Sequence, residues 1–165
     1  MAGKAKIPKT NAMRELERAG IAFSVLTYEV DESDLSGIHV SEQLGEDPGQ
    51  GFKTLVTVSP AGEHVVCCIP VARELDLKAA AREAGAKSLS MMRVKDLVPT
   101  TGYMRGGCSP VGMKKRFPTL IDESCMRFDD IFISGGKRGI QLKLSPRDLI
   151  EFTGARTAPL CREEQ

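Results

Sequence analysis

The sequence predicts an α+β fold rather than a doubly wound α/β fold. Segments with the pattern of β-strands outnumber the helices that could connect parallel strands, and two neighbouring strands form a hairpin. The chain has 165 residues, 41% of them hydrophobic and 27% charged, which is typical of a soluble globular protein with one core. We therefore expect one domain over residues 1–165, with frayed tails at residues 1–8 and 156–165.

The first predicted elements are a helix, a strand and an acidic turn. Residues 11–19 carry apolar side chains at helical spacing, and Gly20 is a natural end for this helix. Residues 21–29 alternate between apolar and polar side chains, which suits a strand. The acidic segment 30–37 has the composition of a turn.

A short helix and a β-hairpin are expected next. The helix covers residues 38–44 and ends at Gly45. Residues 52–58 and 64–69 have the pattern of apolar strands, and the segment 59–62, which reads Ser-Pro-Ala-Gly, is a turn between them.

Two helices are predicted before the glycine-rich part of the chain. Asp76 is a suitable N-cap for a helix that runs to Ala84 and ends at Gly85. Ser90 is the expected cap of a second, short helix, which should stop before Pro99 because proline disfavours helical backbone at the residue before it.

The C-terminal part is expected to contain a loop, three strands and a helix. Residues 101–112 form the loop, because they are too rich in glycine for a regular element. The last helix runs to about residue 152, with Ser145 as its N-cap and Pro146 at its first position. The predicted strands cover residues 119–121, 128–133 and 140–144.

Composition argues against several classes of protein. The net charge is +1, so any affinity for nucleic acid must come from a local patch. No apolar run is long enough for a membrane span, and no apolar segment follows the basic N-terminus as in a signal peptide. The five cysteines are odd in number and include no Cys-x-x-Cys pair, which favours a reducing cytoplasm over a disulfide scaffold. His39 and His64 are far apart, so neither a zinc site nor a cofactor is expected.

Two glycine-rich turns with basic neighbours are the strongest chemical signal in the sequence. The first lies in residues 101–112, where Gly106, Gly107 and Ser109 offer backbone N–H groups that can surround a carbonyl oxygen or a phosphate. The second turn covers residues 134–139. The alternative is a long turn that needs glycine only for its geometry, since the spacing matches neither a P-loop nor a dinucleotide fingerprint.

Basic side chains can supply cations to these turns. Lys53 lies early in an apolar strand, where a lysine either faces solvent or has a task such as holding a carboxylate, a phosphate or a developing oxyanion. Five more cations lie in the second turn or just after the first. If the turns converge, these five form a rim suited to a phosphate backbone, and if they do not, the five are ordinary solvated charges. They are Lys114, Lys115, Arg116, Lys137 and Arg138.

A nucleophilic mechanism carried by the protein is not favoured. Cys108 and Ser109 lie in the first glycine-rich loop, but His39 and His64 are remote in sequence and the next carboxylate is Asp122. A Cys/His or Ser/His/Asp arrangement therefore cannot be assembled from neighbouring residues.

These motifs, taken in order, resemble the YbaK/EbsC family, which is similar to the inserted editing domain of bacterial prolyl-tRNA synthetase. The resemblance extends over nearly the whole chain. Its motifs are Thr27-Tyr28-Glu29, Leu44-Gly45, Lys53-Thr54-Leu55, Pro70-Val71-Ala72, Leu75-Asp76-Leu77-Lys78, Ala84-Gly85-Ala86-Lys87, Thr101-Gly102-Tyr103, Gly106-Gly107-Cys108-Ser109-Pro110, Lys114-Lys115-Arg116-Phe117-Pro118-Thr119 and Ser134-Gly135-Gly136-Lys137-Arg138-Gly139.

The resemblance implies a mixed, barrel-like sheet surrounded by helices and a trans-editing aminoacyl-tRNA deacylase. Such enzymes cleave the ester of mischarged tRNA, chiefly Cys-tRNA(Pro), with Ala-tRNA(Pro) as the alternative. They act in the cytoplasm without a metal, and prolyl-tRNA synthetase is a possible partner. Attack is expected to be substrate-assisted, by a ribose hydroxyl or by the thiol of cysteine. Two further alternatives are an aminoacyl-tRNA binding module with little catalysis and a protein that acts on another small acylated ligand.

The resemblance also assigns roles to individual residues. Lys53 and Gly106 would be catalytic, the lysine by positioning the aminoacyl ester or the terminal phosphate and the glycine N–H by contacting the scissile carbonyl. The five cations named above would bind the CCA end of the tRNA. The substrate-binding residues would be Tyr28, Gly107, Cys108, Ser109, Pro110, Ser134, Gly135, Gly136 and Gln141.

The chain departs from the best-defined cysteine deacylases of this family at two places. Those proteins carry a phenylalanine in the loop after the tyrosine, where this chain has Ser36 or Gly37. They also carry an aspartate just after the second glycine turn, at the position of Gln141. The chain therefore resembles the broader EbsC-type branch, and the amino acid that it removes is not fixed by the sequence.

Overall fold

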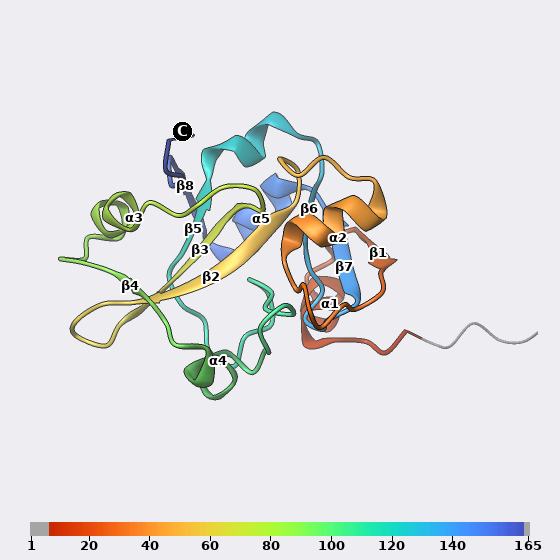
Figure 1. The fold of residues 1–165 in the computed structure, drawn as a ribbon, viewed down its shortest axis with the longest axis horizontal. Helices are drawn as coiled ribbons and strands as arrows, with labels where there is room; N and C mark the ends of the chain where they lie inside the picture. The colour runs from red at the N-terminus through yellow and green to blue at the C-terminus, as the bar shows by residue number, and fades with distance from the viewer. Residues whose placement is uncertain (1–6, 164–165) are drawn as a thin grey trace, which may run out of the picture.

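The computed structural model describes residues 7–163, which fold into two β-sheets with helices around them (Figure 1). The α+β prediction is confirmed. The first sheet has the strand order β1 (Phe23–Thr27), β7 (Ile140–Leu144) and β6 (Ile131–Ser134). The second has the order β4 (Ser90–Met91), β2 (Phe52–Val58), β3 (His64–Pro70), β5 (Thr119–Asp122) and β8 (Arg156–Ala158).

The helices connect these strands without forming regular crossovers. In the described range they are α1 (Asn11–Arg18), α2 (Gly37–Leu44), α3 (Leu77–Ala84), α4 (Val94–Thr101), α5 (Pro146–Thr153) and a 3₁₀ helix, η1 (Glu123–Arg127). The predicted caps of α3 and α5 are confirmed, since Asp76 accepts from the Ala79 N–H and Ser145 from the Asp148 N–H.

The five-stranded sheet is mixed, as expected, whereas the three-stranded sheet is antiparallel, and the two do not close into a barrel. β3 and β5 pair in parallel, as do β5 and β8, whereas the other pairs are antiparallel. The two sheets meet at an isolated bridge between Gly51 and Phe132, where the Phe132 N–H donates to the Gln50 carbonyl over 3.1 Å. One edge of β2 therefore turns toward the three-stranded sheet without joining it along its length.

The predicted helix from Ser90 to the residue before Pro99 is wrong at both ends. Ser90 lies in β4, where it pairs with Val58 at the edge of β2. The helix α4 begins after Arg93, and Pro99 lies inside it. Proline removes one helical hydrogen bond, but the last turn is closed by other donors, because the buried Thr101 hydroxyl donates to the Leu97 carbonyl over 2.8 Å.

The expectation of frayed ends also needs correction. Residues 156–163 are ordered by the parallel pairing of β8 with β5 and by the fully buried side chain of Leu160. Parallel pairing of a short C-terminal strand leaves no periodicity signal in the sequence, which is why the tail was expected to fray. The predicted tail over residues 1–8 falls almost entirely outside the described residues, as do residues 164–165.

The core lies on both faces of the five-stranded sheet. In β3, Val66 and Cys68 belong to the cluster that packs against α1 and α5, while Cys67 and Ile69 belong to the cluster covered by α3. Adjacent Cys67 and Cys68 thus point to opposite faces, as the strand prediction requires.

Asp122 joins this core to the C-terminal segment. Its side chain is 7% exposed, accepts from the Leu160 N–H over 3.0 Å and accepts from the Ser124 N–H over 3.2 Å. Burial raises the pKa of this carboxyl, but the hydrogen bonds from Ser124 and Leu160 together lower it by more. The net pKa therefore lies below the usual 3.8.

We expect Asp122→Ala to lower the free energy of unfolding by about 2–3 kcal/mol, because two buried N–H groups lose a charged acceptor. Since the folded pKa is lowered, this contribution is present above pH 3.8 and is lost as pH falls through the folded pKa. Urea unfolding at pH 7 and at pH 3 measures both effects. Asp129→Ala, at an exposed aspartate, is the control, and equal losses for the two variants would contradict the assignment.

Candidate functional site

A cavity of about 490 Å³ lies along the free edge of β2. At one end of this edge is the bridge between Gly51 and Phe132, and at the other β2 pairs with β4 at Thr57 and Val58. Gly51–Val56 line the cavity between these two ends. In Figure 1, β2 runs diagonally, with α2 near one end and β4 near the other.

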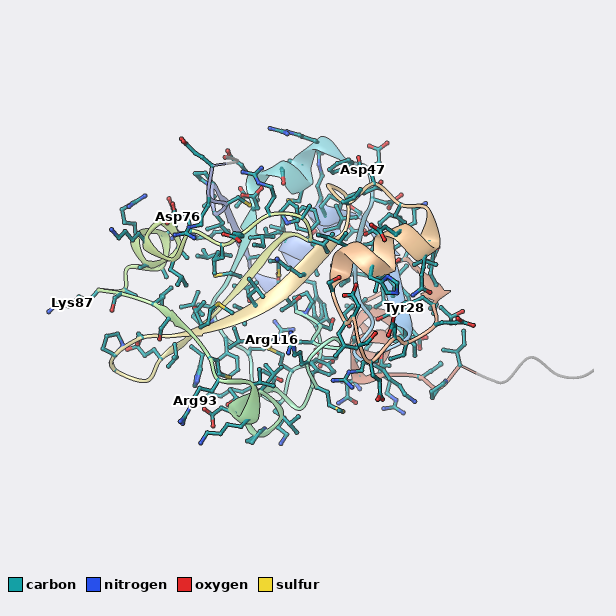
Figure 2. All side chains as sticks on the ribbon, viewed as in Figure 1. Tyr28, Asp47, Asp76, Lys87, Arg93 and Arg116 are labelled. Atoms are coloured by element: carbon teal, nitrogen blue, oxygen red, sulfur yellow. The ribbon has the colours of Figure 1, made fainter. Side chains whose placement is uncertain are left out.

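The remaining walls come from segments that are distant in the sequence. They are residues 33–37 with the start of α2, residues 91–94 before and in α4, three residues of the glycine-rich loop (Arg105, Gly106 and Cys108), and the facing ends of β6 and β7. Tyr28 and Arg93, which are both wall residues, come from different sides of the molecule (Figure 2). The cavity therefore exists only when both sheets and the loops between them are in place.

Lys53 is a half-buried lysine in the wall formed by β2. Its ammonium has no hydrogen bond and no ion pair with any described residue. Burial lowers the pKa of this lysine, while the more distant charge of Glu74 acts in the opposite direction. A desolvated cation without a partner is poised to bind an anionic or strongly polar group of a ligand.

Gly106 lines the same cavity and has a backbone donor that is free. Its φ is +85°, a conformation that glycine adopts readily, and its N–H has no hydrogen-bond partner in the described part of the chain. The neighbouring Gly107 N–H differs, since it donates to the Met104 carbonyl over 2.9 Å within the turn. Gly106 can therefore donate to a ligand without breaking a protein hydrogen bond.

The two glycine-rich turns converge next to this donor. A Cβ on Gly107 would lie 3.0 Å from the backbone nitrogen of Arg138, so only glycine allows the close approach. The Arg138 Nε donates to the Arg105 carbonyl over 2.7 Å, and the ring of Tyr103 packs against Gly136. The second turn thus fixes the position of the first.

The structure divides the predicted substrate-binding residues into two groups. Tyr28, Cys108, Ser134 and Gln141 line the cavity together with Lys53 and Gly106. The others lie outside its wall and build the turns behind it. These are Gly107, Ser109, Pro110, Gly135 and Gly136.

The predicted basic set is divided as well. Arg138 lies at the convergence of the turns, beside Gly106, and Lys137 precedes it on the surface. Lys114 packs against Gly102, and Arg116 lies 4.8 Å from the ring centroid of Phe152 and donates to its carbonyl. Neither Lys114, Lys115 nor Arg116 lines the large cavity.

Three residues near the cavity were not predicted from the sequence. Arg93 and Arg105 line it as exposed cations. Glu46 approaches from behind, where its Oε1 accepts from the Gln141 Nε2 over 2.9 Å. The unusual position of Arg93, directly before α4, was hidden by the incorrect helix prediction, and Glu46 lies in a turn with no periodic signal.

The electrostatics of Glu46 and Gln141 are those of a buried polar pair. Burial raises the pKa of Glu46, while the hydrogen bond from Gln141 and the positive charge of Lys143 lower it, and the net pKa is raised. Glu46 Oε2 and Gln141 Oε1 are buried and find no partner among the described residues.

The candidate nucleophiles of the loop are not activated. Burial raises the pKa of Cys108 to about 12, so the thiol is protonated at neutral pH. Ser109 is fully buried, and its hydroxyl oxygen accepts from the Val111 N–H. His39 and His64 do not line the cavity.

Two features are absent from residues 7–163. No helix there is long and apolar enough to cross a membrane. In residues 7–163, no group of three or more His, Cys, Asp or Glu residues is arranged to hold a metal ion.

Comparison with known proteins gives one family. Residues 38–152, more than half of the chain, match the family model described as the aminoacyl-tRNA editing domain. A protein of Enterococcus faecalis, EbsC, is 43% identical over 164 residues, which are 99% of this chain and 100% of that protein. It is named as a candidate Cys-tRNA(Pro)/Cys-tRNA(Cys) deacylase.

More distant relatives agree with this match. YwhH of Bacillus subtilis is 27% identical over 126 residues, covering 76% of this chain and 79% of that protein. A solved structure described as a candidate trans-editing enzyme for prolyl tRNA synthetase has a TM-score of 0.81 and 25% identity, and the match covers 93% of this chain and 96% of that one.

Proposed function

Because this chain belongs to the aminoacyl-tRNA editing domain family, we propose that it is a trans-editing deacylase whose main substrate is Cys-tRNA(Pro). The reaction hydrolyses the ester between the amino acid and the ribose of the terminal adenosine. The tRNA is released with a free hydroxyl, and the amino acid leaves with a free carboxylate.

A single observation carries the proposal: one cavity holds both an unpaired cation and an unpaired backbone donor. Lys53 and Gly106 line the same 490 Å³ space, which has room for an aminoacyl group and part of a nucleoside. Donors without protein partners are preorganised for negative charge that develops on a carbonyl oxygen.

The proposed chemistry needs no nucleophile from the protein. The ester is already activated, so positioning and polarisation of its carbonyl are sufficient. In our proposal the Gly106 N–H donates to the carbonyl oxygen, and Lys53 holds the ester or the terminal phosphate. Water assisted by a neighbouring ribose hydroxyl attacks the carbonyl carbon, the ester C–O bond breaks, and the tRNA oxygen takes a proton. When the amino acid is cysteine, its thiol can attack instead, and water then hydrolyses the resulting thiolactone to the free amino acid. The protonated state of Cys108 agrees with this mechanism.

Binding of the tRNA end is assigned to the cations at the mouth of the cavity. Arg93, Arg105 and Arg138 are the arginines at or beside the walls, and Lys137 extends this rim. Phosphate contacts of this type weaken as salt increases. Lys114, Lys115 and Arg116 would extend the contact farther along the acceptor end, and prolyl-tRNA synthetase is the proposed partner that selects the tRNA body.

One assay tests the proposal. The protein is incubated with tRNA(Pro) charged with cysteine, alanine, serine or proline, and release of the free amino acid is followed. We expect rapid release of cysteine and no release of proline above the uncatalysed rate. Release of alanine alone would give the alternative Ala-tRNA(Pro) specificity. Binding of tRNA without release of any amino acid would contradict the enzymatic proposal and favour a binding module.

A further inference from the structure

Two buried oxygens beside the cavity lack hydrogen-bond donors, and both belong to the Glu46–Gln141 pair. Gln141 is 7% exposed and lines the cavity, while Glu46 contacts it from behind. Their hydrogen bond, from Gln141 Nε2 to Glu46 Oε1, is 2.9 Å long. It leaves Glu46 Oε2 and Gln141 Oε1 without a partner among the described residues.

Glu46 determines which end of the Gln141 amide is free. An ionised carboxylate only accepts hydrogen bonds, so the amide nitrogen must face Glu46 and the amide oxygen must face away. The backbone of Gln141 cannot shift to change this arrangement, because it lies in β7, the central strand, opposite Leu26 on one side and Ser134 on the other. The amide oxygen of Gln141, and not its nitrogen, is thus the buried group left without a partner beside the cavity.

The Glu46 carboxylate, which accepts from the same amide, favours a cationic donor at this acceptor. Glu46 contributes a carboxylate, and Lys143, which is close enough to influence its pKa, donates no hydrogen bond to either free oxygen. A buried acceptor without a donor costs free energy, and this cost is recovered when a ligand supplies the donor. In an aminoacyl ester, the positively charged donor next to the scissile carbonyl is the α-ammonium group.

We propose that Glu46 is a positioning residue that orients the Gln141 amide, and that Gln141 Oε1 binds the α-ammonium group of the aminoacyl ester. This inference rests on the proposed deacylase function and makes its substrate class narrower. The site accepts esters of amino acids with a free amino group and discriminates against α-hydroxyacyl and N-blocked esters.

The test compares two substrates that differ only at the α position. They are cysteinyl-tRNA(Pro) and 3-mercaptolactyl-tRNA(Pro), in which a hydroxyl replaces the ammonium. If the amino acid panel identifies alanine, the pair is alanyl- and lactyl-tRNA(Pro). For the wild type, kcat/KM relative to the uncatalysed rate should favour the aminoacyl ester by roughly 10- to 100-fold, the factor expected when a buried acceptor loses its donor.

Two variants distinguish positioning from a general structural role. Glu46→Gln keeps the shape of the side chain but allows the Gln141 amide to turn, and Gln141→Met removes the acceptor. Both variants should bring the ratio of kcat/KM for the two substrates toward 1. A structural defect alone would slow both substrates equally and leave the ratio unchanged, which would overturn the inference. Glu42→Gln, at an exposed glutamate of α2, is the matched control and should keep the wild-type ratio. Thermal melting checks that each variant folds. If Gln141→Met does not fold, Glu46→Gln alone decides the test.

The results for the wild-type protein show whether this inference or the proposed function has failed. Cleavage of both esters with a ratio near 1 would overturn the role of Gln141 and leave the deacylase function intact. Cleavage of neither ester would overturn the deacylase function and, with it, the inference.

Discussion

Replacing Lys53 by alanine is expected to reduce deacylation of Cys-tRNA(Pro) by about 100-fold or more, the loss typical when one preorganised electrostatic contact to a transition state is removed. Lys53 is the half-buried cation of the β2 wall, and none of the described side chains forms an ion pair or a hydrogen bond with it. The measurement is single-turnover release of cysteine at saturating protein, which separates the chemical step from tRNA binding. A wild-type rate would contradict the assignment.

The loss of activity should not be accompanied by a loss of stability. Lys53→Met keeps the aliphatic length and removes a desolvated charge, so its melting temperature should equal or exceed that of the wild type while its activity falls as in Lys53→Ala. Lys87→Ala is the control for the removal of a lysine, since Lys87 is exposed at the opposite end of the molecule from Tyr28 (Figure 2). It should keep full activity.

Gly112→Ala is expected to cause the largest loss of stability, about 3 kcal/mol. A Cβ at this position would lie 2.5 Å from the Tyr103 hydroxyl and 2.7 Å from the backbone nitrogen of Ala12. The φ of +84° adds strain for any other residue. The two effects contribute about 1–2 kcal/mol for the backbone and about 1–3 kcal/mol for overpacking. Because Gly112 ends the loop that carries Gly106, we expect activity to fall as well.

Gly62→Ala separates the two contributions. Gly62 has a φ of +85°, nearly the same as Gly112, but nothing lies within 4 Å of a Cβ built there. It should therefore show the backbone strain alone, about 1–2 kcal/mol. Urea unfolding of both variants gives the difference, which is the cost of the contacts with Tyr103 and α1. Equal losses would mean that packing against α1 contributes nothing.

Local signals in the sequence predicted most elements of the fold. Capping residues such as Asp76 and Ser145 and the turn between β2 and β3 act through neighbouring residues, so they are readable without the tertiary structure. The errors occurred where distant pairing decides the outcome. Ser90 joins β2 at its edge, and residues 156–158 form a strand because β5 is available beside them.

The candidate site was predictable in part for the same reason. Lys53 and Gly106 could be singled out because a lysine in a mostly apolar strand and a glycine-rich loop are unusual in themselves, and the family resemblance joined them. Glu46 could not be found in this way. Its importance comes from a contact with Gln141, 95 residues later in the chain, and no spacing rule connects a turn glutamate with a strand glutamine.

The cavity between the two sheets is built from distant segments, and this affects how the protein matures. The cavity walls come from β2, α2, α4, the glycine-rich loop and β7, so the site is assembled only when contacts between distant parts of the chain have formed. Closure of such long loops is slow compared with the formation of local helices. Partly folded chains emerging from the ribosome would therefore bind no charged tRNA productively. Recovery of ester cleavage during refolding would then report the last assembly step, later than the recovery of helical circular dichroism.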